Sequence, residues 1–434
     1  MKSRALTKEA KSLIPGGNSL LSKRAEMFAP EQWPNYFESA NGISVTDIDG
    51  KTYLDFSHFA VGTNTLGYGN KSVDDAVRNC VDKGNMSTLN PPEEVYLARK
   101  LTSMHPWSSM AKFARSGGEA NAIAVRIARN YKAKNIIAFC GYHGWHDWYL
   151  AANLESAGNL DKQLLTGLSP RGVPKSLEGT VRPFMHGDLD SLEKILVEGD
   201  VAAVKMEVMR SHPPKSGYLA EVRRLADKYD ALLIFDECTS GFRETFGGLH
   251  LKYGVEPDIA VFGKTLGNGY AISAVLGSAK VMYEAQNTFI SSTFFTERIG
   301  FAAACAALDE MERLKSWEHI SGIGKLYKTR LRDLLDSTSF NYEISGMDAL
   351  ASFTIHDSEW TAMKTFLIQE MLECNYLTTN LFYPSTVHTE DDVDQFFLVY
   401  REVFERLDLA KRSNISIESL LKGPLCHSTF QRLN

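Results

Sequence analysis

Three residues that could do chemistry together follow apolar segments at nearly equal spacing. Glu207 lies in the segment VAAVKMEV, Asp236 near the end of ALLIFDE, and Lys264 at the end of DIAVFGK. The spacing from each to the next is about 30 residues, which is the length of one β-α-β unit. Ligands of open parallel sheets bind beyond the carboxyl ends of the strands. We therefore expect two carboxylates and an amine to face one crevice.

Lys264 lies where an apolar segment enters the glycine-rich turn GKTLGNG, and three roles compete for it. A phosphate loop of the Walker type needs glycine at position 258, which is Asp258, so this role is excluded. A solvated lysine is the ordinary alternative. The third role is a Schiff base with a cofactor aldehyde. Asp236 favours it, because a carboxylate at the end of a buried strand needs a partner such as a protonated pyridine nitrogen.

Two other segments could supply the remaining parts of a cofactor site. Ser116, Gly117 and Gly118 form a turn before a predicted helix, whose N-terminus could bind a phosphate. The same residues would also make an ordinary helix cap. Tyr142 follows the segment NIIAFC and could lie against a planar ring, or it could pack in the core.

The pair His143 and His146, with Asp147, raises the alternative of a metal site. Histidines three residues apart need a helix to share one face, and Gly144 between them disfavours a helix, so we expect no metal. An anion-binding turn, an aromatic ring, an aspartate for a ring nitrogen and a lysine for a carbonyl are together what pyridoxal 5′-phosphate (PLP) requires. We expect PLP as the cofactor, with Lys264 as anchor and acid–base catalyst.

Length and composition are those of an ordinary globular protein. A chain of 434 residues favours two structural units, and 44% apolar with 23% charged residues is ordinary for a globular protein. The net charge of −6 and the absence of a basic stripe argue against nucleic acid as a partner. No apolar run could span a bilayer, no secretory signal is seen, and six scattered cysteines are typical of a reducing compartment. We expect a cytoplasmic protein without a membrane partner.

The elements that must position these residues alternate between helices and strands. Such alternation predicts a mostly parallel α/β sheet covered by helices. We expect a large domain over residues 70–300 and a smaller domain from both chain ends, 1–69 and 301–434. Alternating apolar residues around Asp49-Gly50 predict a hairpin with a type I′ turn, and FAAACAALDEMERLKSW predicts one long helix. The predicted strands are 135–141, 201–208, 231–237, 258–264, 272–278 and 349–356, and the predicted helices include 93–105 and 118–131.

Together these motifs resemble the class III, fold type I, PLP-dependent aminotransferases, and within them the glutamate-1-semialdehyde 2,1-aminomutase branch. The resemblance covers nearly the whole chain, through LIPGGNS, DIDGKTYLDF, SGGEANAIAVRIAR, GYHGWHD, DECTSGFR with YGVEPDI, and FGKTLGNG. It implies a large domain with a mostly parallel seven-stranded sheet, a smaller α+β domain, and a homodimer.

The resemblance also implies roles for the residues of the phosphate turn and the aromatic motif. Ser116, Gly117 and Gly118 match the family's Ser-Gly-Thr phosphate turn, with glycine in place of threonine. Tyr142 matches the aromatic residue that stacks on the pyridine ring, and His143 matches its neighbour.

Further roles are implied for residues at the strand ends and in a later loop. Glu207 matches the glutamate of the family's Val-Glu-Pro motif, although Val208 replaces the proline. Asp236 and Lys264 match the pyridine-nitrogen and Schiff-base residues. Thr293, in ISSTFFTERIG, matches a threonine that reaches the partner subunit's phosphate.

Three departures from the family pattern bear on activity. Residues 145–180 lack the glycine-rich gating segment of the aminomutase branch. Arg24 is the candidate for a substrate-carboxylate arginine, but its spacing differs by one residue. Phe294 and Phe295 replace small residues near the substrate entrance. Because a gate retains the intermediate that an aminomutase needs, its absence favours transfer between two separate substrates.

We therefore expect a transaminase that moves an amino group from an amino-acid donor, glutamate first, to an aldehyde or ketone. A sugar or surface-polysaccharide precursor is the acceptor that the resemblance suggests. The alternatives are an aminomutase acting on glutamate 1-semialdehyde, a cofactor-binding protein without catalysis, and other PLP chemistry such as decarboxylation.

Overall fold

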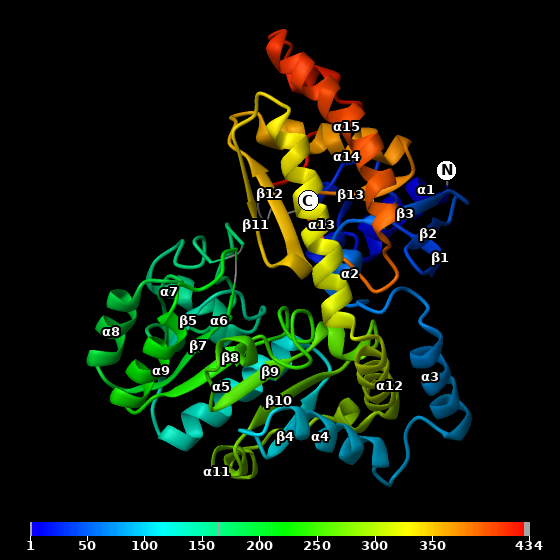
Figure 1. Cartoon of the computed structure of the whole chain (residues 1–434). Coiled ribbons are helices and arrows are strands. Elements are labelled where there is room, and N and C mark those ends of the chain that lie inside the picture. The colour runs from blue at the N-terminus through cyan, green and yellow to red at the C-terminus, as the bar shows by residue number, and fades with distance from the viewer. Residues whose placement is uncertain (1, 164, 210, 429–434) are drawn as a thin grey trace. The chain divides into compact units, whose positions relative to one another are not determined.

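The computed structural model describes residues 2–163, 165–209 and 211–428 and divides into two compact units (Figure 1). Unit 1 draws on both chain ends, up to Asn70 and from Glu318 onward, and unit 2 is Lys71–Trp317. The domain ranges given above stay a prediction, because compactness alone does not show which parts fold independently.

Unit 2 contains the predicted sheet, with seven strands among the described residues in the order β4-β10-β9-β8-β7-β5-β6. The five strands from β9 to β6 are parallel, and β10 runs antiparallel to both of its neighbours. The predicted α/β fold class is confirmed. The strands are β4 (Met110–Ala114), β5 (Ile136–Cys140), β6 (Val181–Pro183), β7 (Val201–Met206), β8 (Leu232–Asp236), β9 (Ile259–Phe262) and β10 (Ser273–Gly277).

Helix α5 (Gly117–Lys132) packs across one face of this sheet, against strands from β4 to β7. Its N-cap is Ser116, whose Oγ accepts from the Glu119 backbone N–H, while the Glu119 carboxylate accepts from the Ser116 N–H. This capping box fixes where the helix begins. Small residues such as Ala120 and Ala124 are fully buried and let the helix approach the strands closely. The first turn of α5 is thereby held beside the ends of the central strands.

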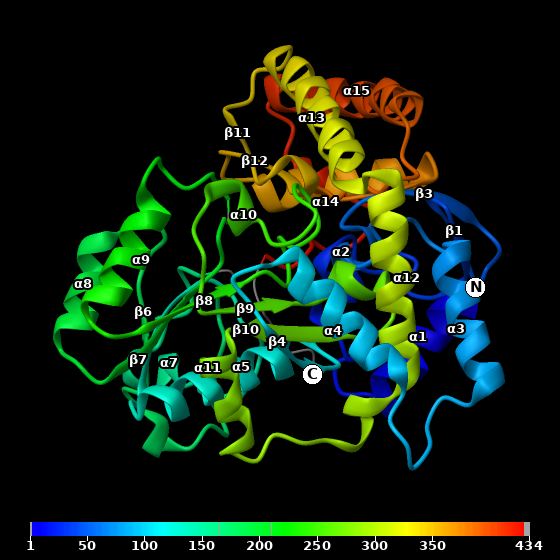
Figure 2. The ribbon, with the colours of Figure 1, turned by 60° about the horizontal axis from the view of Figure 1, so that its bottom comes forward.

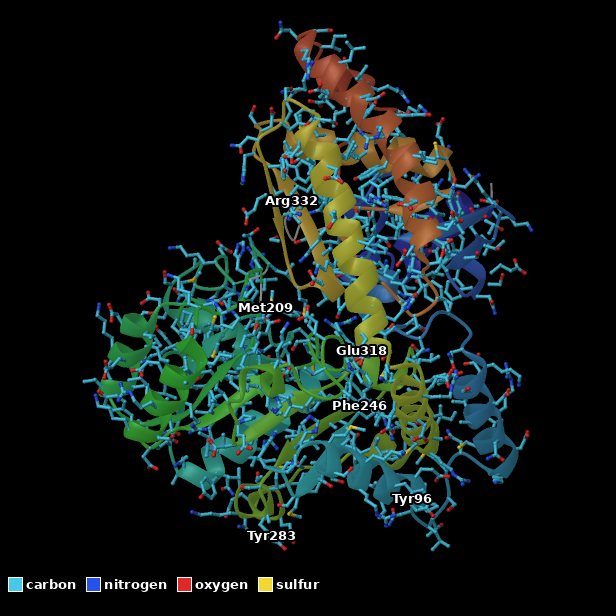
Figure 3. All side chains as sticks on the ribbon, in the orientation of Figure 1. Tyr96, Met209, Phe246, Tyr283, Glu318 and Arg332 are labelled. Atoms are coloured by element: carbon cyan, nitrogen blue, oxygen red, sulfur yellow. The ribbon has the colours of Figure 1, made fainter. Side chains whose placement is uncertain are left out.

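The other helices of unit 2 surround the sheet, and α8 and α9 lie side by side in both ribbon views (Figures 1 and 2). Phe246, labelled in Figure 3, lies in the loop after β8. Its ring stacks on that of Trp317, with centroids 5.0 Å apart. Besides α5, the helices in the described residues of unit 2 are α3 (Lys71–Lys83), α4 (Pro92–Met104), α6 (Asp147–Leu150), α7 (Ala152–Glu155), α8 (Leu189–Val197), α9 (Tyr218–Lys228), α10 (His250–Tyr253), α11 (Ala279–Met282) and α12 (Arg298–Leu314).

The predicted single helix over 301–317 is wrong at its end. Helix α12 stops at Leu314, and Lys315 takes a left-handed backbone with φ +47°, which lets its N–H bond the carbonyl of Glu312. A new helix, α13, begins at once. No helix in the described part of the chain is both long and apolar enough to cross a bilayer.

Unit 1 is built on two sheets in its described residues, ordered β1-β2-β3-β13 and β11-β12-β14, and strand β13 pairs parallel with β3. Its largest core packs α13, α14 and α15 on these sheets. The strands are β1 (Phe37–Asn41), β2 (Ser44–Asp47), β3 (Thr52–Phe56), β11 (Tyr342–Ser345), β12 (Ala351–Ile355), β13 (Tyr376–Thr378) and β14 (Leu381–Phe382). The helices are α1 (Lys2–Leu13), α2 (Phe59–Gly62), α13 (Ser316–Asp336), α14 (Trp360–Glu373) and α15 (Glu390–Arg412).

The predicted hairpin at Asp49-Gly50 is confirmed, since β2 and β3 pair antiparallel around it. Its turn is not type I′, which needs positive φ at both central residues, whereas only Gly50 has it, at +88°. The reason is the side chain of Asp47, whose Oδ1 accepts from the backbone N–H groups of Asp49 and Lys51, each at 2.9 Å. These bonds close a longer loop.

A fully buried histidine, His388, links two parts of unit 1. Its Nδ1 lies 2.8 Å from the Ser385 hydroxyl, and its Nε2 lies 3.0 Å from the backbone oxygen of Asp55. Burial lowers the pKa of His388 to about 4. The ring is therefore neutral at neutral pH.

Candidate active site

Asp236 ends strand β8 and is almost fully buried. Its Oδ2 accepts from Asn121 Nδ2 and from His143 Nδ1, both at 2.8 Å, and its Oδ1 accepts from the Cys238 backbone N–H at 3.0 Å. Burial alone would raise the pKa of Asp236. The hydrogen bond from His143 and the nearby charge of Lys205 outweigh burial and hold this pKa well below its ordinary range. Asp236 is therefore an ionised carboxylate that can hold a cation.

His143, the donor to Asp236 Oδ2, follows the end of β5 by three residues. Its second ring nitrogen, Nε2, is 3.1 Å from the backbone oxygen of Cys140. Burial is the main cause that lowers the pKa of His143 to about 4, and the charge of Lys205 acts in the same direction. In the neutral ring only one nitrogen can donate, and the carboxylate of Asp236 is the stronger acceptor.

Lys264 follows β9 and begins a short 3₁₀ turn, Lys264–Gly267. Its backbone φ is +44°, a left-handed value that is strained for any residue except glycine. Its Nζ donates to Thr239 Oγ1 at 2.7 Å, and the Thr239 carbonyl accepts from Arg243 Nε at 2.6 Å. The buried arginine therefore anchors the loop that holds the lysine.

Cys238 contacts the residues on both sides of the reactive pair. Its backbone N–H donates to Asp236 Oδ1 at 3.0 Å, and a Cβ added to Gly263, the residue before Lys264, would lie 3.4 Å from its sulfur. Burial raises the pKa of the Cys238 thiol well above its ordinary value, Asp236 adds to this effect, and Lys264 opposes it. A Cβ added to Gly117 would lie 3.1 Å from the Cys238 sulfur, so the phosphate turn meets the same residue.

The predicted phosphate turn is closely packed. A Cβ on Gly118 would lie 2.9 Å from two atoms of the His146 ring, so a larger residue at this position would displace that ring. The Ser116 hydroxyl is engaged with Glu119 in the helix cap. The turn opens the 16-residue helix α5, whose first N–H groups and positive dipole end favour an anion.

Tyr142 and Glu207 lie at the ends of the neighbouring strands β5 and β7. The Tyr142 backbone N–H donates to Glu207 Oε2 at 3.2 Å, and the half-buried Tyr142 ring lies edge-on to Tyr149 at 5.8 Å. Gly141 has φ +110°, and a Cβ there would lie 2.5 Å from Glu207 Oε2. Glycine is therefore the residue that position 141 accommodates beside the Glu207 carboxylate.

Thr293 is exposed at the start of a 3₁₀ turn, Thr293–Thr296. Arg115 fixes this segment, because its guanidinium donates to the backbone oxygens of Phe294 at 2.6 Å, Phe295 at 3.0 Å and Glu297 at 2.6 Å. The other predicted residue, Arg24, belongs to unit 1, where its guanidinium packs on Gly16.

Three residues of this site were missed by sequence reasoning. Asn121 lies one turn after the phosphate turn, and its signal is a polar side chain on the buried face of an alanine-rich helix. Thr239 follows Asp236 by three residues in DECTSGFR. Lys205 is a lysine inside the otherwise apolar segment VAAVKMEV, and the structure buries it completely.

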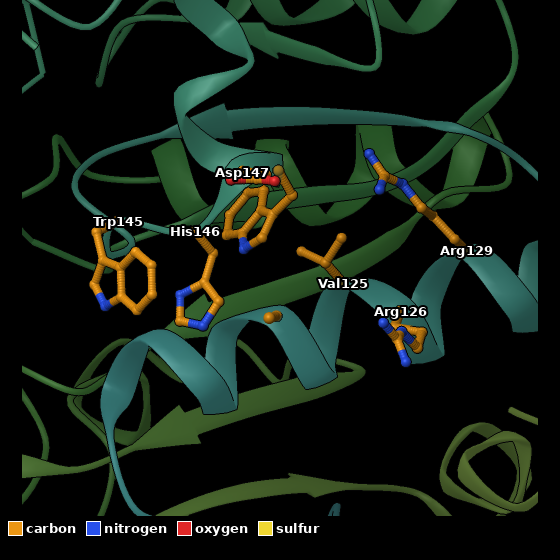
Figure 4. A pocket seen from close by; sticks show the side chains of 8 residues that line it. Val125, Arg126, Arg129, Trp145, His146 and Asp147 are labelled. Atoms are coloured by element: carbon orange, nitrogen blue, oxygen red, sulfur yellow. The ribbon is translucent and has the colours of Figure 1, made fainter. Parts of the chain in front are cut away.

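A separate hollow of about 600 Å³ lies between α5 and residues 145–148 (Figure 4). Trp145 and His146 stack at one side of it, with ring centroids 4.5 Å apart. Neither Asp236 nor Lys264 is among its lining residues in the described part of the chain, so it is not the pocket of the chemistry. Its lining residues are Ala122, Val125, Arg126, Arg129, Trp145, His146, Asp147 and Trp148.

The sequence matches the family model for aminotransferase class-III over residues 28–396. The protein belongs to the class III aminotransferases. This class III aminotransferase is 35% identical, over 369 residues, to the 3-aminobutyryl-CoA aminotransferase of Cloacimonas acidaminovorans, covering 82% of this chain and 84% of that protein. It is 32% identical, over 357 residues and 80% of each chain, to the glutamate-1-semialdehyde 2,1-aminomutase of Methanothrix thermoacetophila.

The fold of this class III aminotransferase matches a solved transaminase with PLP bound, with a TM-score of 0.83, 25% identity, and coverage of 95% of this chain and 99% of that chain. The predicted family, enzyme class and PLP cofactor are confirmed. The residues fit the cofactor, since a buried ionised Asp236, a glycine turn without room for a Cβ, and a lysine in a strained backbone meet around Cys238.

Proposed function

We propose that this enzyme is a transaminase that takes an amino group from an amino-acid donor, glutamate first, and gives it to an aldehyde or ketone. The observation that carries the proposal is the pairing of Asp236 and Lys264 at the ends of adjacent strands, one held ionised and the other held in a strained backbone. Bound PLP supplies an electron sink for the carbon next to the substrate nitrogen.

The chain's own residues supply the proton transfer and the positioning. Lys264 anchors the cofactor aldehyde at rest and carries the proton at the substrate α-carbon during turnover. Thr239 fixes the Lys264 amine through the 2.7 Å hydrogen bond. Asp236 keeps the ring nitrogen protonated, and Asn121 and His143 hold its carboxylate in place.

The remaining predicted contacts complete the cofactor site in this proposal. Ser116, Gly117 and Gly118 bind the phosphate through the first N–H groups of α5. Tyr142 lies against the ring, and Glu207 fixes the Tyr142 backbone. His143 serves the ring indirectly, through Asp236. Arg24, in the other unit, stays the candidate for the substrate carboxylate.

The proposed assembly is a homodimer in which Thr293 reaches the phosphate site of the partner subunit. Large exposed apolar side chains support an interface on unit 2: Trp145 is 70%, Phe289 82% and Phe294 62% exposed. The proposed compartment is the cytoplasm, which agrees with six free thiols in the described residues.

Visible absorption tests the reaction. The wild type should show the band of the lysine-bound cofactor, and excess L-glutamate should bleach it. Lys264→Ala should show neither the band nor turnover, while Lys175→Ala, at an exposed lysine of unit 2, should behave as the wild type. A persistent wild-type band would refute glutamate as donor. Wild-type turnover by Lys264→Ala would refute the role of the lysine.

A second candidate activity is intramolecular transfer on glutamate 1-semialdehyde. The observation in its favour is the similarity to the aminomutase of Methanothrix thermoacetophila across four fifths of both chains. This activity predicts turnover of the semialdehyde without any added donor. No product under those conditions would exclude it.

Two acceptor classes are proposed for the transaminase. A keto or aldehyde sugar, as a precursor of a surface polysaccharide, is supported by the exposed ring of Phe294, near the expected substrate entrance, because an aromatic ring can stack on a sugar. A 3-oxoacyl thioester is supported by the relative named 3-aminobutyryl-CoA aminotransferase. After reaction with glutamate, the enzyme should regain its absorption band when acceptors of one of these two classes are added, and not with the other class.

A further inference from the structure

Lys205 is a buried lysine one residue before the carboxyl end of strand β7. It pairs in register with Phe139 on one side and Ile234 on the other, both part of the apolar core under α5. Its exposure is 0%, and its Nζ has no hydrogen-bond partner among the described residues. A buried ammonium without a partner is costly, and lysine is almost never fully buried unless paired. This position therefore requires an explanation beyond packing.

The groups that face Lys205 come from every element packed against β7. Asp236 ends β8 on the same face of the sheet as Lys205, and Cys238 follows it. His143 comes from the loop after β5. Helix α5 brings the uncharged Asn121, whose Oδ1 also has no hydrogen-bond partner among the described residues.

Of these facing groups, only the carboxylate is charged at neutral pH. Burial keeps His143 neutral by lowering its pKa to about 4, and burial keeps Cys238 neutral by raising the pKa of its thiol. Asp236 is ionised. Lys205 therefore faces one anion that it does not touch.

We propose that Lys205 is the counter-cation of Asp236 in the cofactor-free protein, and that it releases its proton when the protonated ring nitrogen of the cofactor takes that place. Lys205 is then a positioning residue that couples cofactor loading to the release of one proton. The inference rests on the proposed role of Asp236 as the partner of the ring nitrogen.

The physical reason is that one buried carboxylate cannot balance two nearby cations. Burial lowers the pKa of Lys205, and the charge of Asp236 is the main opposing influence. A protonated ring nitrogen at Asp236 cancels that influence, so the ammonium loses its proton to solvent and becomes a neutral amine. The electron pair of the broken N–H bond stays on Lys205 Nζ as the lone pair of the amine, and the Asp236 carboxylate stays ionised throughout.

The test counts protons on binding. Pyridoxine 5′-phosphate has an alcohol in place of the aldehyde, so Lys264 cannot react with it. Titration calorimetry in buffers of different ionisation enthalpy gives the number of protons released, for the wild type and for Lys205→Met. We expect the wild type to release about one proton more than the variant. Wild-type affinity relative to the variant should rise about tenfold per pH unit over the range in which Lys205 is protonated in the apoprotein and neutral in the complex.

Each outcome decides something. Equal proton release in the two proteins, with the ligand bound to both, overturns the inference. Failure of the ligand to bind either protein would instead contradict the proposed site. Lys175→Met, at an exposed lysine, is the matched control and should release as many protons as the wild type.

Folding of the variants is a test in itself. Removing one partner of a buried charge pair lowers stability, but Asp236 keeps its hydrogen bonds from Asn121, His143 and the Cys238 backbone N–H. Lys205→Met and Lys205→Leu should therefore still fold in the cofactor-free state, with lower stability than the wild type. If both fail to fold, Lys205 is a structural residue and the inference is wrong.

Discussion

Lys264 and Lys315 share a strained backbone, with φ of +44° and +47°, but only Lys264 lies at the active site. The left-handed region costs an L-residue roughly 1–2 kcal/mol, and glycine enters it freely. The entropy of the unfolded chain disfavours glycine relative to alanine by about 0.4–1 kcal/mol. We therefore predict that Lys264→Gly is more stable than Lys264→Ala by about 0.5–1 kcal/mol.

Comparing glycine with alanine isolates the backbone, because both variants lack the Nζ that donates to Thr239. The assay is scanning calorimetry of the cofactor-free variants, where the difference corresponds to roughly 0.5–1 °C for a chain of 434 residues. Lys315→Gly and Lys315→Ala should differ in the same direction. At Lys325, an exposed position inside α13, alanine should be more stable than glycine by about 1 kcal/mol.

Activity separates the two strained lysines. Both substitutions at Lys264 should abolish turnover, and both at Lys315 should preserve it. If Lys264→Ala is the more stable member of its pair while the Lys315 pair behaves as predicted, the backbone at the active-site lysine stores no strain. The pairing of strain with function would then be refuted.

Three further predictions follow from the buried polar groups. His143 and His388 have pKa values of about 4 in the folded protein, against about 6.5 in the unfolded chain. Their contribution to stability is therefore complete above pH 6.5 and falls by about 1.4 kcal/mol per pH unit for each histidine as the pH drops towards 4. Urea unfolding between pH 7 and 5 measures this loss. Gly141→Ala should lower stability by about 2–3 kcal/mol, seen by thermal unfolding, because its Cβ meets the Glu207 carboxylate at positive φ. Asn121→Leu removes a donor to the active-site aspartate and should weaken PLP binding roughly tenfold, measured by titration of the apoenzyme.

The strands and the reactive pair could be predicted from the sequence because they depend on short-range patterns. Strands β8 and β9 are buried on both faces and therefore read as continuous apolar segments. Asp236 is the last residue of β8 and Lys264 follows β9 by two residues, at the edge where parallel strands end. The spacing between them needs only the length of one β-α-β unit.

The support of that pair could not be predicted, because it depends on side-chain directions and on long-range contacts. Tyr142 and His143 are adjacent, and nothing in their types shows which one meets Asp236. The left-handed backbone of Lys264 has no sequence signal, because lysine itself disfavours it and the surrounding fold imposes it. Lys205 is hidden by the apolar residues on both sides of it.

The pairing of β13 with β3 has a consequence for biosynthesis. Strand β3 is made within the first 60 residues, whereas its neighbour β13 spans Tyr376–Thr378. Unit 2 is continuous in sequence, so it can be completed on the ribosome before β13 exists. At about 5–20 residues per second, β3 waits roughly 15–60 s for its partner. During that interval its free edge can pair with another nascent chain, so translation speed and chaperone access should decide the yield of correctly folded protein.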